Sequence, residues 1–596
     1  MNLFKRKTNF FKKITNYLWS FFGIFGKHFS KRKNFNHINV DQKLVYDLSP
    51  KKIPSGQQLK HLHRFLNPRE YLIIKICLLL IIVNAAYLGV AFFKKHLSYS
   101  PLVGGEYIEG VIAYPKAINP LYAVNRDIDS DLSRLIYSSL FRYNGEGELV
   151  NDLVAEYSIN GNTEYIFKIK EGVKWHNGES LTIDDVIFTI SAIKNEEYRS
   201  PLKNIFSGAE LERVDDFTLK ISLSSPYAPF LSNLTFGILP KNVWEKVVPG
   251  SAILSELNLK PIGSGLYKFK SLVKNKDGEI KEYNLAVNDE YYSQKPYIKN
   301  IKFKFFVNYT EAIKALNDNQ IDGLGYLPLN ERQELIAKDS LFFHELARPQ
   351  VFGLFFNFEK DKALGDKTAR ISLAQAIDKE QLIKDIFDGA YRSEDGPILK
   401  NNYAYNNEII RYGYNPEEAA NNIKNKLAST SLTVVDSGRN VAVAEKIKQY
   451  WESIGVAVEL KIIASEKAAE VVKGRDFEII FYGQAVGADP DVYAFWHSSQ
   501  AKAGGLNIAS YNNAEADTLL TEGRETANLT ERITKYKKFQ ENIASNLPAI
   551  FLYSPTYTYV QSKKVHGFQA TTLVEPSDRF ATVADWYLKT KTKLIW

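Results

Sequence analysis

Apolar residues run almost without interruption over residues 71–93, YLIIKICLLLIIVNAAYLGVAFF, where Lys75 is the one charged side chain. At 1.5 Å per residue, a helix of this length would reach about 34 Å, more than the roughly 30 Å of a bilayer's hydrocarbon core. Lys75 lies near one end, from where its side chain can reach the lipid headgroups. The pattern therefore predicts one transmembrane helix over 71–93. A buried helix fits the pattern less well, and a cleaved signal peptide does not fit the roughly 70 residues that precede the run.

From residue 105 onward, short alternating runs typical of strands are interspersed with helical spacing. The pattern predicts strands at 109–114, 164–170, 217–223 and 477–483, and a helix over 128–141. LTVVD (432–436), a helical stretch around 439–453 and VAVELKII (456–463) have the order of a βαβ unit. A chain of 596 residues exceeds what a single core supports. We therefore expect a mixed α/β protein with more than one lobe.

The net charge of +8 is concentrated at one end of the chain. Residues 1–70 contain 15 Lys/Arg and 3 Asp/Glu, which leaves 61 Lys/Arg and 65 Asp/Glu in the remainder. The main body is thus mildly acidic, and we expect it to bind no nucleic acid. The positive-inside rule predicts residues 1–70 to be a basic cytoplasmic arm. Residues from about 97 onward would then lie outside the cell membrane, in a single-pass topology.

Within the arm, residues 9–33 space Phe10, Ile14, Leu18 and Phe21 by three or four positions, with Lys and Arg on either side. This spacing is that of an amphipathic helix on an anionic membrane surface, and a disordered basic tail is the alternative. The one cysteine, Cys77, lies in the apolar run, so the body of the protein has neither disulfides nor thiolate chemistry.

The stretch KIKEGVKWHNGESLTIDDV (168–186) resembles a reaction site but is explained by folding requirements. Asn177-Gly178 is a strong hairpin-turn signal, because both residues tolerate positive φ. Thr182 followed by Asp185 is a capping-box pattern at the start of a helix. A metal site would need partners for His176, and no HxH or HExxH spacing occurs. The other histidines beyond residue 100 are His344, His497 and His566. We predict no metal and no catalytic residue here.

This stretch resembles the signature of the family 5 extracellular solute-binding proteins, the peptide- and nickel-binding components of ABC importers. It has Asn177 where Asp is usual. Four further segments, in the family's order, are similar to the remaining motifs: residues 118–157, PIGSGLYKF (261–269), ISLAQAIDKEQLIKDIFDGAY (371–391) and YNPEEAANNIKNKL (414–427). The resemblance covers residues 106 to about 570.

The resemblance implies a two-lobed periplasmic-binding-protein fold of the α/β class with an extra inserted domain. Lobe I would comprise residues 105–150, 261–345 and 555–596, the inserted domain 151–260, and lobe II 350–554. The partners implied are a peptide ligand and the permease subunits of an ABC transporter. We expect a monomer without a cofactor, held in the membrane by residues 71–93.

Ligands of α/β sheets bind beyond the carboxyl ends of strands, and QAVGADPDVYAFW (484–496) follows the predicted strand 477–483. In peptide-binding members of the family, an Asp of this loop pairs with the ligand's α-amino group. The matching residue is Asp489, with Asp491 as second choice. Aromatic and polar candidates for the cavity walls are Tyr482, Tyr493, Trp496, Tyr114 and Asn119. No arginine is evident for a ligand carboxylate, so the preferred peptide length stays open.

The sequence supports three alternatives to peptide capture to different degrees. An anchored hydrolase lacks support, because no G-x-S-x-G occurs and Gly263-Ser264-Gly265 has a different spacing. The long cytoplasmic arm leaves open that the same fold acts as a ligand sensor. A nickel chelate or another solute also stays possible as the ligand. We therefore predict a binding protein, not an enzyme.

Overall fold

The computed structural model describes residues 66–336 and 338–594. They divide into two units, one with the described residues up to Ser98 together with Lys593 and Leu594, the other with Tyr99–Thr592. Most of the basic arm, including the amphipathic stretch predicted at 9–33, lies outside the described residues.

The predicted apolar span lies within one helix, α4 (Pro68–His96). Its first turn is capped by Glu70, whose carboxylate accepts a hydrogen bond from the backbone N–H of Asn67 at 3.0 Å. Among the described helices, it alone is long and apolar enough to cross a membrane, over Pro68–Phe92. The apolar side chains of this segment are exposed, for example Leu79 and Ile81.

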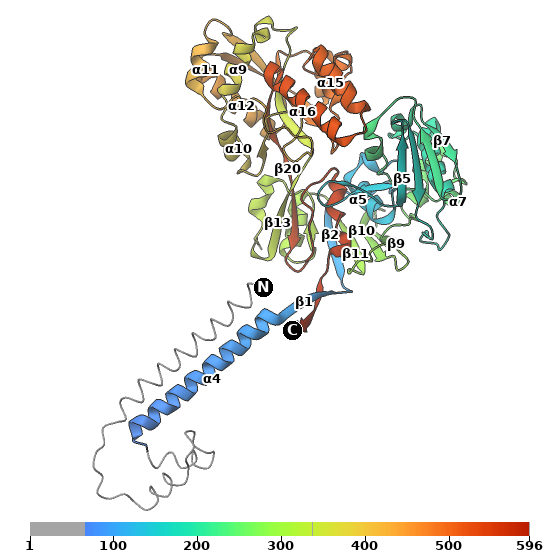
Figure 1. The fold of residues 1–596 in the computed structure, drawn as a ribbon, viewed down its shortest axis with the longest axis vertical. Coiled ribbons are helices and arrows are strands. Elements are labelled where there is room, and N and C mark those ends of the chain that lie inside the picture. Colours follow the sequence, from blue (N-terminus) through green and yellow to red (C-terminus); the bar gives the residue numbers. More distant parts are fainter. Residues whose placement is uncertain (1–65, 337, 595–596) are drawn as a thin grey trace, which may run out of the picture. The chain divides into compact units, whose positions relative to one another are not determined.

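Lobe I is built on a seven-stranded sheet that joins segments far apart in the sequence (Figure 1). β2 runs parallel to both of its neighbours, β11 and β12, whereas every other pair is antiparallel. In spatial order the strands are β13 (Leu341–Ala347), β20 (Thr556–Ser562), β12 (Gly323–Leu324), β2 (Glu106–Ile112), β11 (Asn300–Phe306), β10 (Ile280–Val287) and β9 (Tyr267–Lys274). The helices of this lobe are α5 (Asp127–Ile136) and α8 (Tyr309–Asn317).

The inserted domain is a four-stranded antiparallel sheet, which confirms the strands predicted at 164–170 and 217–223. Its order is β5 (Val154–Asn160), β6 (Glu164–Ile169), β8 (Thr218–Ser222) and β7 (Glu210–Arg213). Helix α6 (Ile183–Lys194) buries Val186 and Ile190 in one apolar cluster with Phe167 of the sheet. Three short elements complete the surroundings: β3 (Phe141–Tyr143), β4 (Leu149–Asn151) and α7 (Lys241–Trp244).

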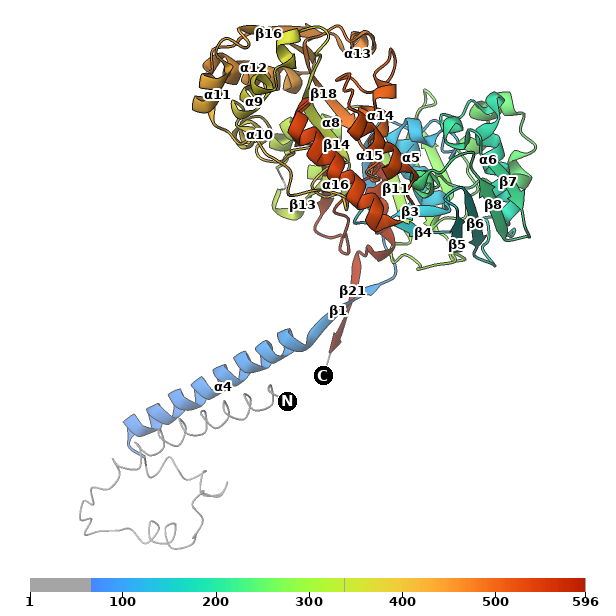
Figure 2. The ribbon, with the colours of Figure 1, turned by 45° about the horizontal axis from the view of Figure 1, so that its top comes forward.

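Lobe II has helices on both faces of a six-stranded sheet (Figure 2). The strand order is β15 (Arg392–Ser393), β19 (Ala549–Ser554), β14 (Gln350–Phe356), β18 (Ile479–Ala485), β16 (Ser429–Val435) and β17 (Ala457–Ile463). Leu354 and Phe481 pack under α9 (Lys367–Gln375), α10 (Lys379–Phe387), α11 (Pro416–Ile423) and α12 (Gly438–Ser453). On the opposite face, Phe355 and Ile480 pack under α14 (Tyr493–Trp496), α15 (Ala514–Glu525) and α16 (Leu529–Asn546). A further short helix is α13 (Ala468–Gly474). The predicted βαβ unit is confirmed, because β16 and β17 pair in parallel around α12.

The two lobes are joined by two extended connections. β13 passes into β14 through Arg348 and Pro349, and β19 passes into β20 through Pro555. The four strands form an antiparallel ribbon, since β13 pairs with β20 and β14 with β19. Ser554 Oγ donates to the carbonyl oxygen of Arg348 at 3.1 Å, which links the two connections where the lobes meet.

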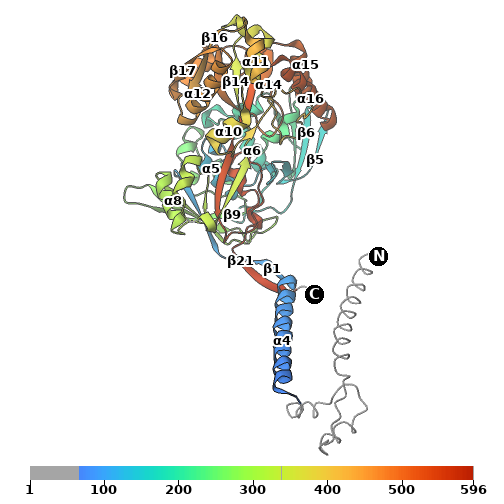
Figure 3. The ribbon, with the colours of Figure 1, turned by 90° about the vertical axis from the view of Figure 1, so that its left-hand side faces the viewer.

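The ends of the main unit also pair. β1 (Leu97–Leu102) and β21 (Lys589–Leu594) form a separate two-stranded sheet (Figure 3). Ser100 Oγ donates to the carbonyl oxygen of Lys591 at 3.3 Å. The segment that follows α4 in sequence is thus held against the last strand of the chain.

A buried ionic cluster fastens the C-terminal segment to lobe I. Arg579, which is 2 % exposed, binds Asp131 of α5 through both terminal nitrogens at 2.5 and 2.6 Å. Its Nε donates to Glu109 of β2 at 3.1 Å, and Glu109 also accepts hydrogen bonds from the hydroxyls of Tyr107 and Tyr559 at 2.6 and 3.0 Å. Charges are tolerated in a core only when they are paired. Removal of one partner should therefore lower the free energy of unfolding strongly.

The stretch 168–186 lies at the junction where the inserted domain packs against lobe I. The capping box of Thr182 and Asp185 is confirmed at the start of α6. At the predicted turn, Gly178 has a positive φ, of 89°, and Asn177 does not; the side chain of Asn177 accepts from the N–H of Glu179 at 3.2 Å. His176 Nδ1 accepts from the N–H of Gly263 at 3.2 Å, and Nε2 lies 3.2 Å from the carbonyl oxygen of Gly265.

Gly263 and Gly265 are required at this junction because they lie directly against the end of α5. A Cβ at Gly263 would lie 1.9 Å from the carbonyl oxygen of Ile136, and the N–H of Gly265 donates to that oxygen at 2.8 Å. The G-x-G of PIGSGLYKF therefore caps the C-terminal end of α5, and its backbone contacts the ring of His176.

Burial lowers the pKa of His176 to about 4 from an ordinary value of 6.5. Because the folded pKa is the lower one, the unfolded chain binds the extra proton between these values. The contribution of His176 to stability is therefore complete above about pH 6.5 and is lost as the pH falls toward 4. In His176→Gln we expect a shallower decline of stability over this range, measured as the urea midpoint of the full chain at several pH values. His566→Gln, which changes an exposed histidine, should keep the wild-type slope; equal slopes in all three proteins would contradict the prediction.

Candidate functional site

A cavity of about 800 Å³ lies between lobe II on one side and lobe I with the inserted domain on the other. Tyrosines line one wall, namely Tyr143, Tyr157 and Tyr165 from β3, β5 and β6. The wall from lobe II consists of the loop 397–403, the loop 486–490 and the first turns of α16. Its volume falls within the range of small-molecule sites, which is about 300–1,000 Å³.

The loop after β18 places Asp489 at this cavity, as expected for a segment beyond the carboxyl end of a strand. Gly487 turns the chain with a φ of 73°. Asp489 then accepts from the N–H of Asp491 at 2.9 Å, and Asp491 accepts from the N–H of Tyr493 at 3.2 Å. These successive turns lead into α14 and fix the direction of both carboxylates.

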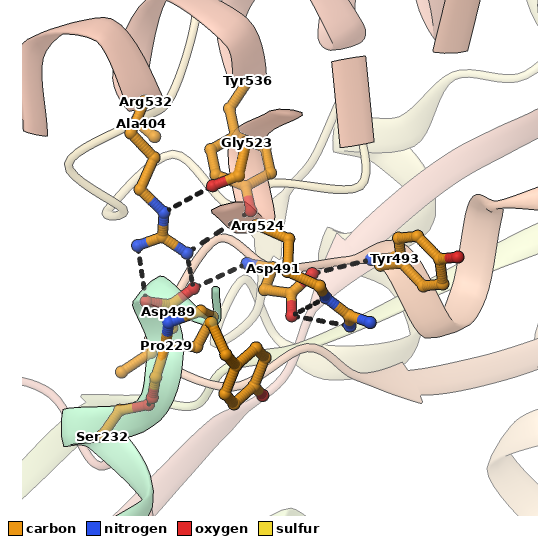
Figure 4. Close-up of polar contacts among 12 residues, drawn as sticks. Pro229, Ser232, Ala404, Asp489, Asp491, Tyr493, Gly523, Arg524, Arg532 and Tyr536 are labelled. Carbon is orange, nitrogen blue, oxygen red and sulfur yellow. Dashed lines mark hydrogen bonds and ion pairs between the residues drawn. The ribbon is translucent and has the colours of Figure 1, made fainter. Parts of the chain in front are cut away.

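Asp489 is paired with Arg532 of α16 through two parallel hydrogen bonds (Figure 4). Nη1 donates to Oδ2 at 2.7 Å and Nη2 to Oδ1 at 2.6 Å. The two side chains are 19 % and 6 % exposed. Burial alone would lower the pKa of Arg532, but the hydrogen bonds and the charge of Asp489 raise it above its usual value. The pair is a fork-to-fork contact of the strongest kind that side chains make.

Asp491 forms a second pair, with Arg524 of α15, whose Nε and Nη2 donate to Oδ2 at 3.0 and 2.7 Å. The guanidinium lies 3.9 Å from the ring centre of Tyr493 and 5.5 Å from that of Tyr227 in the inserted domain. Nearby, Asn162 Nδ2 donates to the carbonyl oxygen of Glu525 at 3.0 Å. α15 therefore contacts the inserted domain beside the cavity.

The remaining predicted site residues lie elsewhere. Trp496 is fully buried in the core of lobe II against Phe355 and Phe551, and Tyr482 packs at the edge of the same cluster. Asn119 is buried in lobe I, where it binds Asn258 at 3.1 Å. Tyr114 is exposed. None of these four lines the cavity, and neither does Tyr493, whose ring packs against the guanidinium of Arg524.

Sequence reasoning did not find Arg532, Tyr403 or the tyrosines of the opposite wall. Arg532 had a signal, because it lies on the buried face of α16 with Tyr536 and Phe539. An arginine at such a position requires a buried counter-ion. Among the residues that the structure describes, no group of three or more His, Cys, Asp or Glu side chains is placed to hold a metal ion.

Two α/β lobes that enclose a cavity and are joined by two extended connections have the architecture of the two-lobed solute-binding proteins. The sequence pattern of the bacterial extracellular solute-binding proteins, family 5, matches residues 148–507, and the chain belongs to this family. The resemblance and the fold class predicted from the sequence are thereby confirmed.

Similar proteins agree with this assignment. The oligopeptide-binding protein AppA of Bacillus subtilis is 26 % identical over 522 residues, which are 83 % of this chain and 93 % of the relative. Its structure in complex with a nonapeptide has a TM-score of 0.61, covering 82 % of this chain and all of the other. The ABC transporter substrate-binding protein CtaP of Listeria monocytogenes is 25 % identical, with a TM-score of 0.71 and coverage of 82 % and 99 %.

Arg524→Ala should loosen the contact between α15 and the inserted domain. The lost cation–π contact is worth about 0.5–1 kcal/mol at a partly exposed site, so the open population should rise about twofold to fivefold. Spin labels at Glu171→Cys and Lys424→Cys, in a Cys77→Ser background, would report the inter-lobe distance in the full chain. Lys538→Ala on the exposed face of α16 is the control. Identical distance distributions in all variants would refute the role of Arg524.

Proposed function

We propose that this chain is a membrane-anchored extracytoplasmic binding protein that captures peptides in the inter-lobe cavity and delivers them to an ABC permease. This inter-lobe cavity is the observation that carries the proposal. Of the tyrosines on its wall, Tyr157 is exposed and supplies an aromatic face, which suits the side chains of an extended ligand. The relatives named for oligopeptide binding and for an ABC transporter support this choice of ligand and partner.

The proposed role includes binding and transfer without a chemical reaction. Both carboxylates of the loop after β18 are held in ion pairs, so neither is poised as an acid or a base. Closure of the lobes about Pro349 and Pro555 would enclose the ligand. The membrane is engaged by α4, with the basic arm in the cytoplasm.

Purified full-length protein should carry peptides that native mass spectrometry detects. Tyr157 of β5 lines the cavity and is 43 % exposed, so Tyr157→Ala should bind such peptides about tenfold more weakly. Tyr414→Ala is the matched control, because Tyr414 is 52 % exposed and lies outside the cavity. Absence of bound peptide from the wild type, both as purified and after incubation with a peptide library, would reject the proposed function.

The topology is tested by labelling single cysteines in right-side-out membrane vesicles. In a Cys77→Ser background, a membrane-impermeant maleimide should modify Asp277→Cys in the main unit and leave Lys27→Cys in the arm unmodified until the vesicles are opened. This outcome follows from the excess of Lys and Arg before α4. The reverse labelling pattern would show the opposite orientation.

A further inference from the structure

The carboxylate of Asp489 is already occupied by the chain itself. Oδ1 accepts from Arg532 Nη2 at 2.6 Å and from the N–H of Asp491 at 2.9 Å, while Oδ2 accepts from Arg532 Nη1 at 2.7 Å. A carboxylate has about four acceptor positions, so three of them are used before any ligand arrives. Its charge is also balanced within the chain.

Arg532 is held so that it cannot easily leave Asp489. Its Nε donates to the carbonyl oxygen of Gly523 at 2.9 Å, and the outer nitrogens also donate to the hydroxyls of Tyr403 at 3.0 Å and Tyr536 at 3.4 Å. All five N–H groups of the guanidinium therefore have acceptors. Displacement of Arg532 by a ligand would leave buried donors and a buried charge without partners, which is strongly unfavourable.

A ligand ammonium that approached Asp489 would meet this guanidinium at close range. The attraction of the carboxylate and the repulsion of the guanidinium then largely cancel, whereas a lone carboxylate would favour the ammonium strongly. Two further carboxylates at the cavity, Glu146 and Glu148, are exposed to solvent, where an ion pair contributes little. The cation Lys400 at the rim is paired with Asp395 at 3.2 Å.

We propose that Arg532 is a specificity-determining residue, which neutralises Asp489 from within and frees the site from any requirement for a charged amino terminus. The site would then bind peptides with an uncharged amino end, such as N-acylated or cyclic peptides. It would bind peptides with a free amino terminus equally well. This inference rests on the proposed peptide function. It replaces the expectation that Asp489 anchors the α-amino group of the ligand.

The test uses the full-length protein in detergent and two pools of random hexapeptides, one with free and one with acetylated amino termini. The pools are mixed in equal amounts, and retained peptides are counted by mass spectrometry. The wild type should retain both pools within about threefold of each other, because the local charge is balanced. Arg532→Gln removes the guanidinium charge and leaves Asp489 uncompensated, so it should favour free amino termini by about tenfold or more. Lys538→Gln, which removes a positive charge from the exposed face of α16, should behave like the wild type.

The possible outcomes are distinct. A wild type that retains free peptides about tenfold over acetylated ones would overturn the proposal, as would an unchanged ratio in a folded Arg532→Gln protein. If Arg532→Gln does not fold, Asp489→Asn, which leaves the guanidinium charge uncompensated, should shift the ratio toward acetylated amino termini; an unchanged ratio there would count against the proposal. Retention of neither pool by the wild type would reject the peptide function itself.

Discussion

The architecture depends on one antiparallel ribbon that belongs to both sheets. β13 and β20 pair in lobe I and β14 and β19 in lobe II, so the chain crosses between the lobes only in extended conformation. Strand pairing fixes the spacing of the two crossings, and the prolines at 349 and 555 remove one backbone donor from each. Both prolines lie between the named strands, so the strand pairing within each sheet does not involve them. The cavity borders this place, since Pro349 is one of its lining residues.

Both lobes contain a buried arginine whose charge is paired with a carboxylate. Arg579 is enclosed by Asp131 and Glu109 in lobe I, and Arg532 is enclosed by Asp489 and two tyrosine hydroxyls in lobe II. Each guanidinium links segments that are far apart in the sequence, because a planar group with five donors can hold several acceptors at once. The difference is location: the first cluster lies inside a core, and the second forms part of the cavity surface. The same type of contact is thus enclosed in a core in one lobe and shapes the electrostatics of the cavity surface in the other.

The sequence predicted those features that depend on local pattern. The apolar run before Lys94, the βαβ unit around α12 and the capping box at Thr182 are all present. The helix predicted over 128–141 ends earlier, at Ile136, because the carbonyl oxygen of that residue is taken by Gly265. The sequence predicts Asp489 as a site residue because it follows a strand. Its partner comes 43 residues later, on helix α16. No spacing rule connects the two, and the same holds for Trp496, whose aromatic ring is as suitable for a core as for a binding site.

The junction of His176 with Gly263 and Gly265 has a consequence for how proteins of this kind are identified. These residues form a recognisable sequence motif for two reasons. No larger side chain fits between Ile136 and the G-x-G turn, and the imidazole forms hydrogen bonds with two backbone groups. None of these residues lines the inter-lobe cavity. A match to the motif therefore identifies the fold and gives no information about the ligand. Two chains with the same junction can therefore differ at the cavity, for example at the position of Arg532, without any change in the motif.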